Sequence, residues 1–430
     1  MLKSIGLLSL LLALGAVAAR AVDPLPRATP ESVGMSSERL ARLDAALQRE
    51  VEKGRMPGAV VAVARQGKLV HFKAYGHADK ARGTAMPLDG IFAIASMTKP
   101  FVGTAIMMLQ EEGRLSLSDP VEKYLPELAN RRVGVLGEGD PGQTASVGQL
   151  STVPAQRSIT LIDLARHTSG ITYGGRGTTP VHKMYPASSN WAGENLTGAQ
   201  FLEQLSKAAL LYQPGTVWDY SLSIDVLGLV VERVSGKPLG AFLQERLFRP
   251  LGMAGTGFVV PQENAPRIAR ALPNDPDTGK PQSVPDRAAP VKFECGGGCA
   301  ASTAGDYLRF AQMLLDGGAL NGTRLLGRKS VEAMTADQMT PGIDNRIAVT
   351  DPNGAGYGFG ITVAVRPGVG VGSGLIGSPG DFYWNGAYGT LWWADPKEGL
   401  AVVFMTQTPG DQRREYRRLV NSLVYQAIVD

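Results

Sequence analysis

The chain has 430 residues, of which 44% are apolar, so it can bury a large core and is not disordered as a whole. Its 43 lysines and arginines nearly balance its 39 aspartates and glutamates, and this balance does not favour a nucleic-acid partner. Glycine occupies 53 positions, well above the usual share of about 7%, which indicates many turns and argues against a helical repeat or a coiled coil.

The first residues have the features of a secretory signal peptide. Lys3 precedes a long apolar run, and residues 19–21 have the small-x-small pattern that signal peptidases accept. The run is shorter than the ~20 residues that span a bilayer, so a transmembrane anchor is the less favoured interpretation. We expect residues 1–21 to be a cleaved signal peptide, 22–35 an N-terminal extension, and 36–430 a single folded unit with a helical insertion. The mature protein is then expected in the periplasm or secreted, with no stable membrane insertion.

The predicted elements begin with a helix and a hairpin. Leucines at helical spacing follow a pair of serines, which predicts a helix over residues 36–52. Residues 59–64 and 68–74 read as two strands joined by a tight Gln-Gly turn. Residues 97–113 are apolar on almost every side of a helix, so this helix is expected to be buried.

Helices follow in the middle of the chain, and strands return at its end. Residues 119–177 are expected to form long ordered loops that contain one short helix, and residues 261–290 a further loop. Further helices are expected at 160–166, 198–211, 223–235, 239–248, 303–317 and 413–428. Further strands are expected at 358–365, 389–393 and 401–406. Because strands lie at both ends with helices between them, we expect a mixed α/β (α+β) fold with one sheet assembled from distant segments.

The two cysteines are close together in the sequence. Cys295 and Cys299 are separated by three glycines, which permit the tight reversal that a disulfide needs, and export would bring them into an oxidising compartment. We expect a disulfide; two free thiols that pack in the core are the alternative. A metal site would need further ligands, and the four histidines show no zinc-type spacing with the cysteines. Neither a metal nor another cofactor is expected.

Ser96 and Lys99 form an S-x-x-K pattern at the start of the buried helix. A serine hydroxyl becomes a good nucleophile only when a base takes its proton. Residues three apart on a helix share a face, so the lysine can reach the serine. Apolar neighbours and the positive end of the helix both favour a neutral amine, which can accept that proton. The pattern alone occurs often by chance, so it needs support from other segments.

Two further segments supply such support. Tyr220 lies just before the helix at 223–235, where a loop can present its phenol; an ordinary buried tyrosine is the alternative interpretation. Residues 383–389, with the sequence Tyr-Trp-Asn-Gly-Ala-Tyr-Gly, introduce a strand with glycines that let the backbone approach a ligand closely. A tight turn packed with aromatic side chains is the alternative interpretation of that segment.

Together these segments resemble the three motifs of the serine β-lactamase and penicillin-binding-protein superfamily, in the class C-like branch that includes family VIII carboxylesterases. That family has S-x-x-K first, a motif that begins with tyrosine second, and K-T-G or W-x-G third. The matching segments here are Ser96/Lys99, Tyr220-Ser221-Leu222 and Trp384-Asn385-Gly386. The resemblance covers roughly residues 39–427. It implies a β-lactamase/DD-peptidase-like fold, in which an antiparallel sheet flanked by helices meets a helical region and the active site lies between them.

The resemblance also implies a role for each motif residue in acyl transfer. Ser96 would be the acylated nucleophile, Lys99 its proton partner, and Tyr220 the general base that then protonates the leaving group. The backbone N–H groups of Ser96 and Ala387 would form the oxyanion hole. The substrate-binding residues that it implies are Trp384, Asn385 and Gly386.

Two departures from the β-lactamase pattern favour an ester as the small-molecule substrate. Leu222 and Trp384 stand where β-lactamases of this branch carry the asparagine and lysine that grip the amide and carboxylate of a β-lactam. We therefore expect a carboxylesterase with at most weak β-lactam turnover. A D-Ala-D-Ala carboxypeptidase or peptide amidase is the alternative enzyme, disfavoured by the missing basic residue. A penicillin-binding sensor without turnover is less favoured, because all three polar catalytic groups are present.

A Ser-His-Asp hydrolase is a weaker alternative. Such enzymes usually carry G-x-S-x-G after a strand, and the chain has no such pattern. His167 and Ser169 lie close together in the segment His-Thr-Ser-Gly, but we expect this stretch to shape a loop at the edge of the cleft.

Overall fold

A computed structural model describes residues 23–135, 150–369 and 374–430. The expected signal peptide, residues 1–21, lies outside these ranges. Within them, no helix combines the length and apolar character that crossing a membrane requires.

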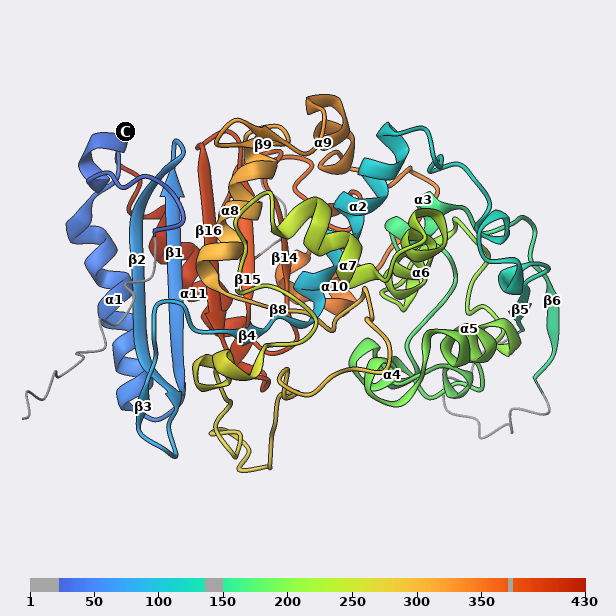
Figure 1. Cartoon of the computed structure of the whole chain (residues 1–430), viewed down its shortest axis with the longest axis horizontal. Coiled ribbons are helices and arrows are strands. Elements are labelled where there is room, and N and C mark those ends of the chain that lie inside the picture. Colours follow the sequence, from blue (N-terminus) through green and yellow to red (C-terminus); the bar gives the residue numbers. More distant parts are fainter. Residues whose placement is uncertain (1–22, 136–149, 370–373) are drawn as a thin grey trace, which may run out of the picture.

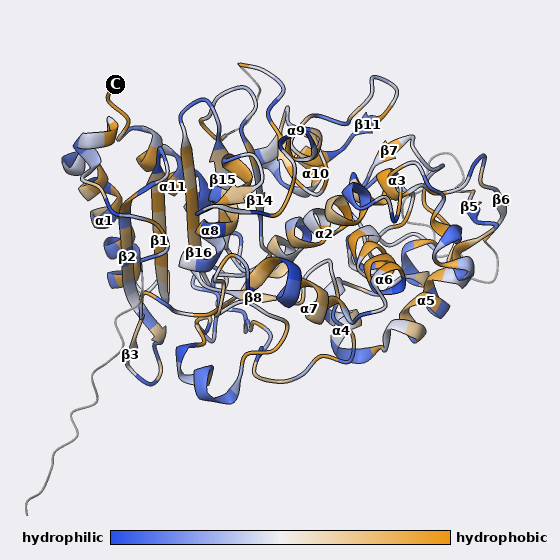
Figure 2. Cartoon of the chain, turned by 45° about the horizontal axis from the view of Figure 1, so that its top comes forward, coloured by the Kyte–Doolittle hydropathy of each residue, from blue (hydrophilic) through white to orange (hydrophobic). Residues whose placement is uncertain are grey.

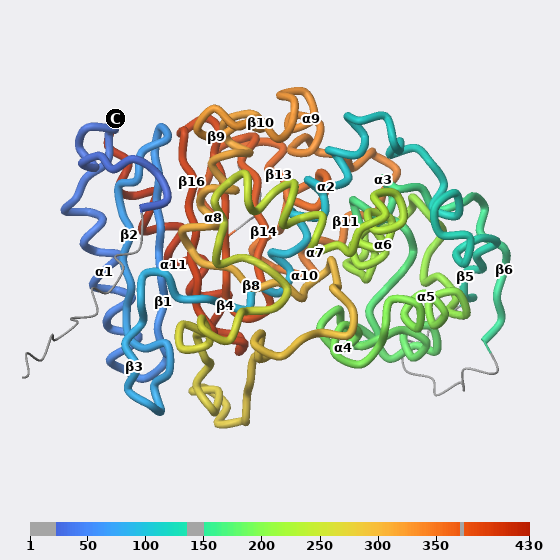
Figure 3. Tube along the Cα trace, in the orientation of Figure 1, coloured from blue at the N-terminus to red at the C-terminus, as the bar shows by residue number. Residues whose placement is uncertain are grey.

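One large antiparallel sheet brings the two ends of the chain together. Its strand order is β12-β13-β14-β15-β16-β1-β2-β3, so the last strand pairs directly with the first (Figure 3). The strands are β1 (Gly58–Arg65), β2 (Lys68–Asp79), β3 (Thr84–Ala85), β12 (Gly358–Phe359), β13 (Ala364–Val365), β14 (Phe382–Asn385), β15 (Leu391–Asp395) and β16 (Leu400–Thr406). The mixed α/β fold and the sheet built from distant segments are therefore confirmed.

Helices cover both faces of this sheet. The helices α1 (Ser37–Glu52) and α11 (Gln412–Tyr425) pack against each other behind the sheet, and α8 (Ala304–Leu315) crosses its front (Figure 1). All eight residues of β1 are buried, as expected for a central strand that is covered on both sides. The side chain of Ser36 accepts a hydrogen bond from the N–H of Arg39, which caps α1 where the sequence predicts its start.

A helical region stands beside the sheet. At its centre, α2 (Lys99–Glu111) is buried from Lys99 to Leu109, because the sheet and the other helices surround it (Figure 1). The strands β1 and β16 are largely hydrophobic, whereas α1 and α5 alternate between hydrophobic and hydrophilic residues (Figure 2). The remaining helices of this region are α3 (Leu161–Ala165), α4 (Ser189–Asn195), α5 (Gly198–Lys207), α6 (Ser223–Ser235) and α7 (Leu239–Leu243), which a π-helical turn extends over Gln244–Phe248.

Short elements connect the two regions. They are β4 (Phe92–Ala93) paired with β8 (Ala301–Ser302), β5 (Arg132–Gly134) with β6 (Thr152–Pro154), β7 (Val217–Trp218) with β11 (Asp344–Asn345), β9 (Ala319–Leu320) with β10 (Thr323–Arg324), and the helices α9 (Arg328–Met334) and α10 (Ile347–Thr350). The predicted loops at 119–177 and 261–290 are largely irregular where they are described, although the first contains β5 and β6.

Three predicted elements differ from the structure. The strand expected at 358–365 is the hairpin of β12 and β13, whose connection includes Thr362 with a φ of 65°. The helix expected at 198–211 ends at Lys207, because Leu210 leaves it to hydrogen-bond with Arg132 and Gly134 beside β5. The segment at 383–389 begins within β14 itself, paired with β13 and β15.

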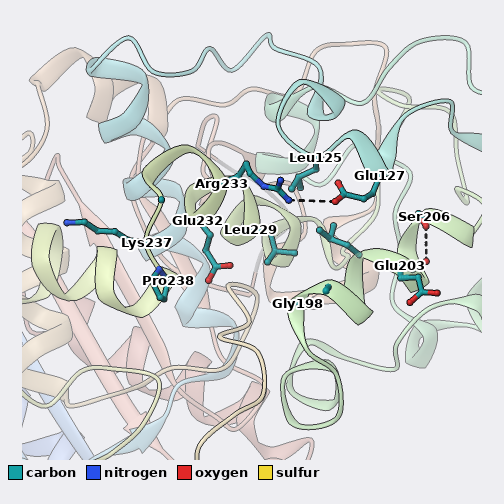
Figure 4. A pocket seen from close by; sticks show the side chains of 13 residues that line it. Leu125, Glu127, Gly198, Glu203, Ser206, Leu229, Glu232, Arg233, Lys237 and Pro238 are labelled. Atoms are coloured by element: carbon teal, nitrogen blue, oxygen red, sulfur yellow. Dashed lines mark hydrogen bonds and ion pairs between the residues drawn. The ribbon is translucent and has the colours of Figure 1, made fainter.

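A cavity of about 770 Å³ opens between α5 and α6 (Figure 4). Its apolar lining includes Leu202 and Leu229, and an ion pair of 3.6 Å joins Arg233 to Glu127. The hydroxyl of Ser206 donates to the carbonyl oxygen of Glu203 in its own helix. In the described part of the chain, none of Ser96, Lys99 and Tyr220 lines this cavity, so it is not the catalytic site that the sequence predicts.

Candidate active site

Ser96 lies in a short 3-10 turn, Ala95–Thr98, that leads directly into α2. Ala95 has a φ of 44°, a left-handed conformation that costs energy in a non-glycine residue and tends to occur at functional sites. The hydroxyl of Thr98 donates to the carbonyl of Ala95 and accepts from the N–H of Ala300, which fixes the turn. The Ser96 side chain is partly exposed although both of its neighbours are buried. The turn therefore presents one hydroxyl to a ligand.

Lys99 is completely buried, and three oxygen atoms surround its amine. Its Nζ lies 3.3 Å from Oγ of Ser96, 3.3 Å from Oη of Tyr173 and 2.6 Å from the carbonyl oxygen of Gly297. A neutral amine has two N–H bonds and one lone pair. When the carbonyl and the phenol accept the two hydrogens, the lone pair faces Ser96 and can take its proton.

The phenol of Tyr173 begins a buried relay that the sequence reasoning missed. Its Oη lies 3.0 Å from Oγ of Ser189, which donates to Oδ2 of Asp225 at 2.7 Å. Because the Ser189 proton goes to the carboxylate, the Tyr173 proton goes to Ser189, and the phenol oxygen remains as an acceptor for Lys99. Burial raises the pKa of Asp225 to about 6, while the nearby Lys99 opposes this rise. The tyrosine, serine and aspartate are scattered in the sequence, so no local motif signals them.

Tyr220 stacks beside Lys99. The Nζ of Lys99 lies 4.5 Å from the centre of the Tyr220 ring. The ring of His167 also packs against the Tyr220 ring, with 4.7 Å between the two ring centres. The phenol oxygen accepts a hydrogen bond of 3.4 Å from Nε1 of Trp384. The guanidinium of Arg176 lies 5.8 Å from the same ring. The structure thus brings the predicted lysine, tyrosine and tryptophan into one contiguous group, with the Lys99 amine and the Arg176 guanidinium near the Tyr220 ring.

The third motif lies against the peptide that precedes the nucleophile. A Cβ at Gly386 would collide with the carbonyl oxygen of Ile94, so only glycine permits this approach. The buried guanidinium of Arg417 donates to the carbonyl oxygen of Gly386. In a trans peptide the N–H points opposite to the C=O, so the N–H of Ala387 points away from Arg417. This geometry suits an oxyanion-hole donor beside Ser96.

Asn385, a predicted substrate-binding residue, has a structural partner. Its Nδ2 donates to Oδ2 of Asp351 at 2.6 Å, at the end of β14. Leu222, two residues after Tyr220, is fully buried at the start of α6. In the described part of the chain, no hydrogen bond joins the Asn385 side chain to Ser96 or Lys99.

The disulfide between Cys295 and Cys299 closes a small loop that contains Gly297, a hydrogen-bond partner of Lys99. Gly297, at the centre of this loop, accepts from Lys99 through its carbonyl and donates its N–H to Oδ1 of Asp225 at 2.8 Å. A Cβ at Gly297 would collide with Asp225 and Ser189. The cysteine pair therefore holds the backbone that orients the amine, and both thiol positions are fully buried.

Replacement of both Cys295 and Cys299 by serine is expected to lower kcat for an ester roughly 10- to 100-fold, because a displaced Gly297 carbonyl releases the Lys99 amine. The five-residue closed loop accounts for about 2 kcal/mol of unfolding free energy. Steady-state kinetics and urea unfolding of the double variant measure both effects. Wild-type kcat in a folded, disulfide-free protein would show that the loop holds its position without the covalent link.

Protonation of Asp225 is expected to give activity an acid limb near its pKa of about 6. A protonated Asp225 carboxyl donates to Ser189 instead of accepting from it, so the hydrogen bonds of the relay reverse their direction. We therefore expect kcat/KM to fall as the pH drops below that value. Because the folded pKa is raised, this carboxyl favours the folded state most at low pH, and its contribution declines as the pH rises through about 6. Profiles of kcat/KM from about pH 5 to about pH 8 for the wild type and for Asp225→Asn test this. An unchanged acid limb in the variant would assign it to another group.

The alternative nucleophile Ser169 is fully buried. Its Oγ pairs with Oγ of Ser223 at 2.8 Å, whereas Nδ1 of His167 pairs with Ser221 at 3.1 Å. Burial holds the pKa of His167 well below its usual value. The ring of His167 packs 4.7 Å from the ring of Tyr220, and the expectation that this stretch shapes the edge of the cleft stays a prediction. In the described residues, no group of three or more His, Cys, Asp or Glu side chains is arranged to hold a metal ion.

Comparison with known proteins identifies the family. The family model described as Beta-lactamase matches residues 43–426. The chain belongs to the beta-lactamase family. Among the relatives of this beta-lactamase-family protein, Protein Rv1367c from Mycobacterium tuberculosis is 36% identical over 368 residues, which cover 84% of this chain and 88% of the relative. Esterase EstB from Burkholderia gladioli is 30% identical over 385 residues, which cover 86% of this chain and 90% of the relative.

The solved structures agree with this assignment. EstCE1, described as a hydrolase with promiscuous acyltransferase activity, matches with a TM-score of 0.74 and 25% identity, covering 90% of this chain and 99% of the other. Relatives named for D-alanyl-D-alanine carboxypeptidase activity also match, at 25% identity. The chain is therefore a serine hydrolase of the superfamily that its motifs resemble, near the family VIII esterases.

Proposed function

We propose that this protein hydrolyses carboxylic esters through an acyl-enzyme on Ser96. The observation that carries the proposal is the position of the buried Lys99 amine, whose Nζ lies 3.3 Å from the partly exposed Ser96 hydroxyl. The other two neighbours of this amine, the Tyr173 phenol and the Gly297 carbonyl, are both hydrogen-bond acceptors. Such an arrangement supplies a base for the nucleophile without a histidine. The similarity to Esterase EstB supports ester chemistry in particular.

In the first step, Lys99 takes the Ser96 proton while Oγ attacks the ester carbonyl carbon. The carbonyl oxygen becomes an oxyanion, which the N–H groups of Ser96 and Ala387 stabilise. The C–O bond to the alcohol then breaks, and the leaving alkoxide receives a proton from Tyr220, which Lys99 replenishes. The alcohol departs and the acyl group stays on Ser96.

In the second step, a water molecule attacks the acyl carbon. Tyr220 passes its own proton to the neutral Lys99 amine and accepts one from this water, and the tetrahedral intermediate again places its oxyanion near Ala387. The bond from the acyl carbon to Oγ breaks, Oγ recovers its proton from Lys99, and the carboxylic acid leaves. The two cations near Tyr220, from Lys99 and Arg176, stabilise negative charge on the phenol oxygen during both transfers.

Trp384 supports an ester as the preferred substrate. It donates to the Tyr220 phenol at 3.4 Å, and its ring packs at 5.5 Å from that phenol. An indole offers no cation to a substrate carboxylate, so a β-lactam or a peptide C-terminus gains no ion pair at this position.

Selectivity between an ester and a β-lactam tests the proposal. We expect kcat/KM for p-nitrophenyl butyrate to exceed that for a chromogenic cephalosporin by at least ~100-fold, and Trp384→Lys to reduce this ratio at least ~10-fold because it supplies a cation for the β-lactam carboxylate. Trp384→Phe is the matched control, since it keeps an aromatic ring without adding a charge. Efficient cephalosporin turnover with little ester turnover by the wild type would overturn the esterase assignment.

A further inference from the structure

A polar cluster outside the catalytic residues borders the turn that carries Ser96. It consists of Asn190, Arg287 and Tyr388, and we call it the acyl-side cluster. The first two residues of α4 face different surroundings: Ser189 bonds to Tyr173 and Asp225, whereas Asn190 bonds to Arg287. Tyr388 directly follows the proposed oxyanion-hole residue. The cluster therefore joins three distant parts of the chain beside the nucleophile.

Arg287 is a buried cation without a carboxylate partner. Its side chain is only 1% exposed, and burial lowers its pKa. Among the described residues, no carboxylate lies within 4 Å of its guanidinium; Glu194 and Tyr388 act on it only through longer-range electrostatics. Its Nε also has no hydrogen-bond partner there. An unpaired buried charge is costly, so its presence beside a catalytic turn calls for a functional explanation.

Arg287 fixes the orientation of the Asn190 amide. The guanidinium donates to Oδ1 of Asn190, so Nδ2 lies on the other side of the amide. Burial raises the pKa of Tyr388 to about 12, and a hydrogen bond with the Asn190 side chain works against this rise, as expected if the phenol oxygen accepts from Nδ2. The amide nitrogen carries two hydrogens, so the second N–H remains for a ligand.

The amide also lies close to the reacting group. A Cβ built at Gly298 would be 3.4 Å from Nδ2 of Asn190 and 3.8 Å from the carbonyl carbon of Ala95, the residue before Ser96. Nδ2 therefore lies at most about 7 Å from the carbonyl carbon of Ala95.

We propose that Asn190, oriented by Arg287, binds an oxygen acceptor on the acyl group of the substrate. This inference rests on the proposed ester hydrolysis. The leaving alcohol must face Lys99 and Tyr220 to receive its proton, so the acyl chain extends the other way, past Ala387 toward Tyr388. The substrate class is therefore an ester whose acyl chain carries an amide carbonyl or a carboxylate a few bonds from the ester. Asn190 is the binding residue and Arg287 a positioning residue.

Three phenyl esters of equal shape test the proposal on the full-length protein. Phenyl 4-methylpentanoate ends in two methyl groups. Phenyl N-acetylglycinate replaces one methyl with an amide oxygen and the neighbouring methylene with an amide N–H, and monophenyl succinate replaces both methyls with carboxylate oxygens. We expect kcat/KM for at least one oxygen-bearing ester to exceed that of 4-methylpentanoate by at least ~10-fold, mainly through KM. Comparison of the two oxygen-bearing esters separates an amide from a carboxylate ligand.

Variants assign this preference to the cluster. Asn190→Leu should reduce the preference to about one while 4-methylpentanoate turnover stays within about threefold of wild type. Arg287→Met should also raise KM for the oxygen-bearing ester. Arg287→Lys should raise this KM less, because lysine keeps a hydrogen-bond donor. Ser96-dependent hydrolysis of all three esters without a preference, or an equal loss on all three in Asn190→Leu, would overturn this inference alone. Absence of any ester turnover by the wild type would overturn the proposed function, and this inference with it.

Discussion

Replacement of Ser96 by alanine is expected to abolish ester turnover, with a loss in kcat/KM of at least ~10⁴-fold. Without Oγ there is no atom to carry the acyl group, and only the oxyanion hole and substrate binding remain. The side chain is partly exposed in a turn that other residues fix, so the variant should fold normally. Initial rates with p-nitrophenyl butyrate, with circular dichroism to check folding, measure the effect.

Ser169→Ala is the matched control for this prediction. Ser169 is fully buried and bonded to Ser223, so its loss is expected to cost about 1–3 kcal/mol of stability and to change kcat/KM less than about threefold. Ester activity that survives in Ser96→Ala but disappears in a folded Ser169→Ala protein would transfer the nucleophile to the alternative serine.

Replacement of Lys99 by methionine is expected to lower kcat roughly 10³-fold with a small change in KM. Methionine fills a similar volume but cannot take the Ser96 proton, and it leaves the acceptors on Tyr173 and Gly297 without a donor. That loss is expected to cost about 1–3 kcal/mol of unfolding free energy. Single-turnover kinetics show whether acylation is the step that slows.

Lys99→Arg separates a proton acceptor from a positive charge. A guanidinium remains protonated and has no lone pair to offer, so this variant should be as inactive as Lys99→Met. Lys73→Met is a suitable control, because Lys73 is exposed and paired with Asp44. Near wild-type activity in Lys99→Arg would mean that the residue acts through its charge and that another group is the base.

Much of the fold follows from local sequence patterns. The helix at Ser37–Glu52 begins at a serine cap, and the first hairpin turns at a Gln-Gly pair, so nearest-neighbour chemistry decides both. The hairpin at 358–365 was not predicted as such, because a continuous apolar run does not reveal a reversal at a non-glycine residue, Thr362. The early end of the helix at Lys207 depends on pairing with β5, a long-range contact that no local window contains.

The candidate site also combines features that local sequence predicts with features that depend on long-range packing. Ser96 and Lys99 share one helical turn, so their contact follows from spacing alone, and the resemblance supplied Tyr220 and Trp384. The relay through Tyr173, Ser189 and Asp225 connects residues up to 52 positions apart and depends on how one loop and the helices α4 and α6 pack around Lys99. Buried polar networks of this kind are set by tertiary packing, which periodicity does not encode.

The most direct test of the central claim is mass spectrometry of the protein quenched during turnover of p-nitrophenyl butyrate. The account predicts a protein heavier by one butyryl group, about 70 Da, with the modification on the peptide that contains Ser96 and absent in Ser96→Ala. An acyl group on any other residue, or rapid ester hydrolysis with no covalent adduct at any quench time, would contradict it.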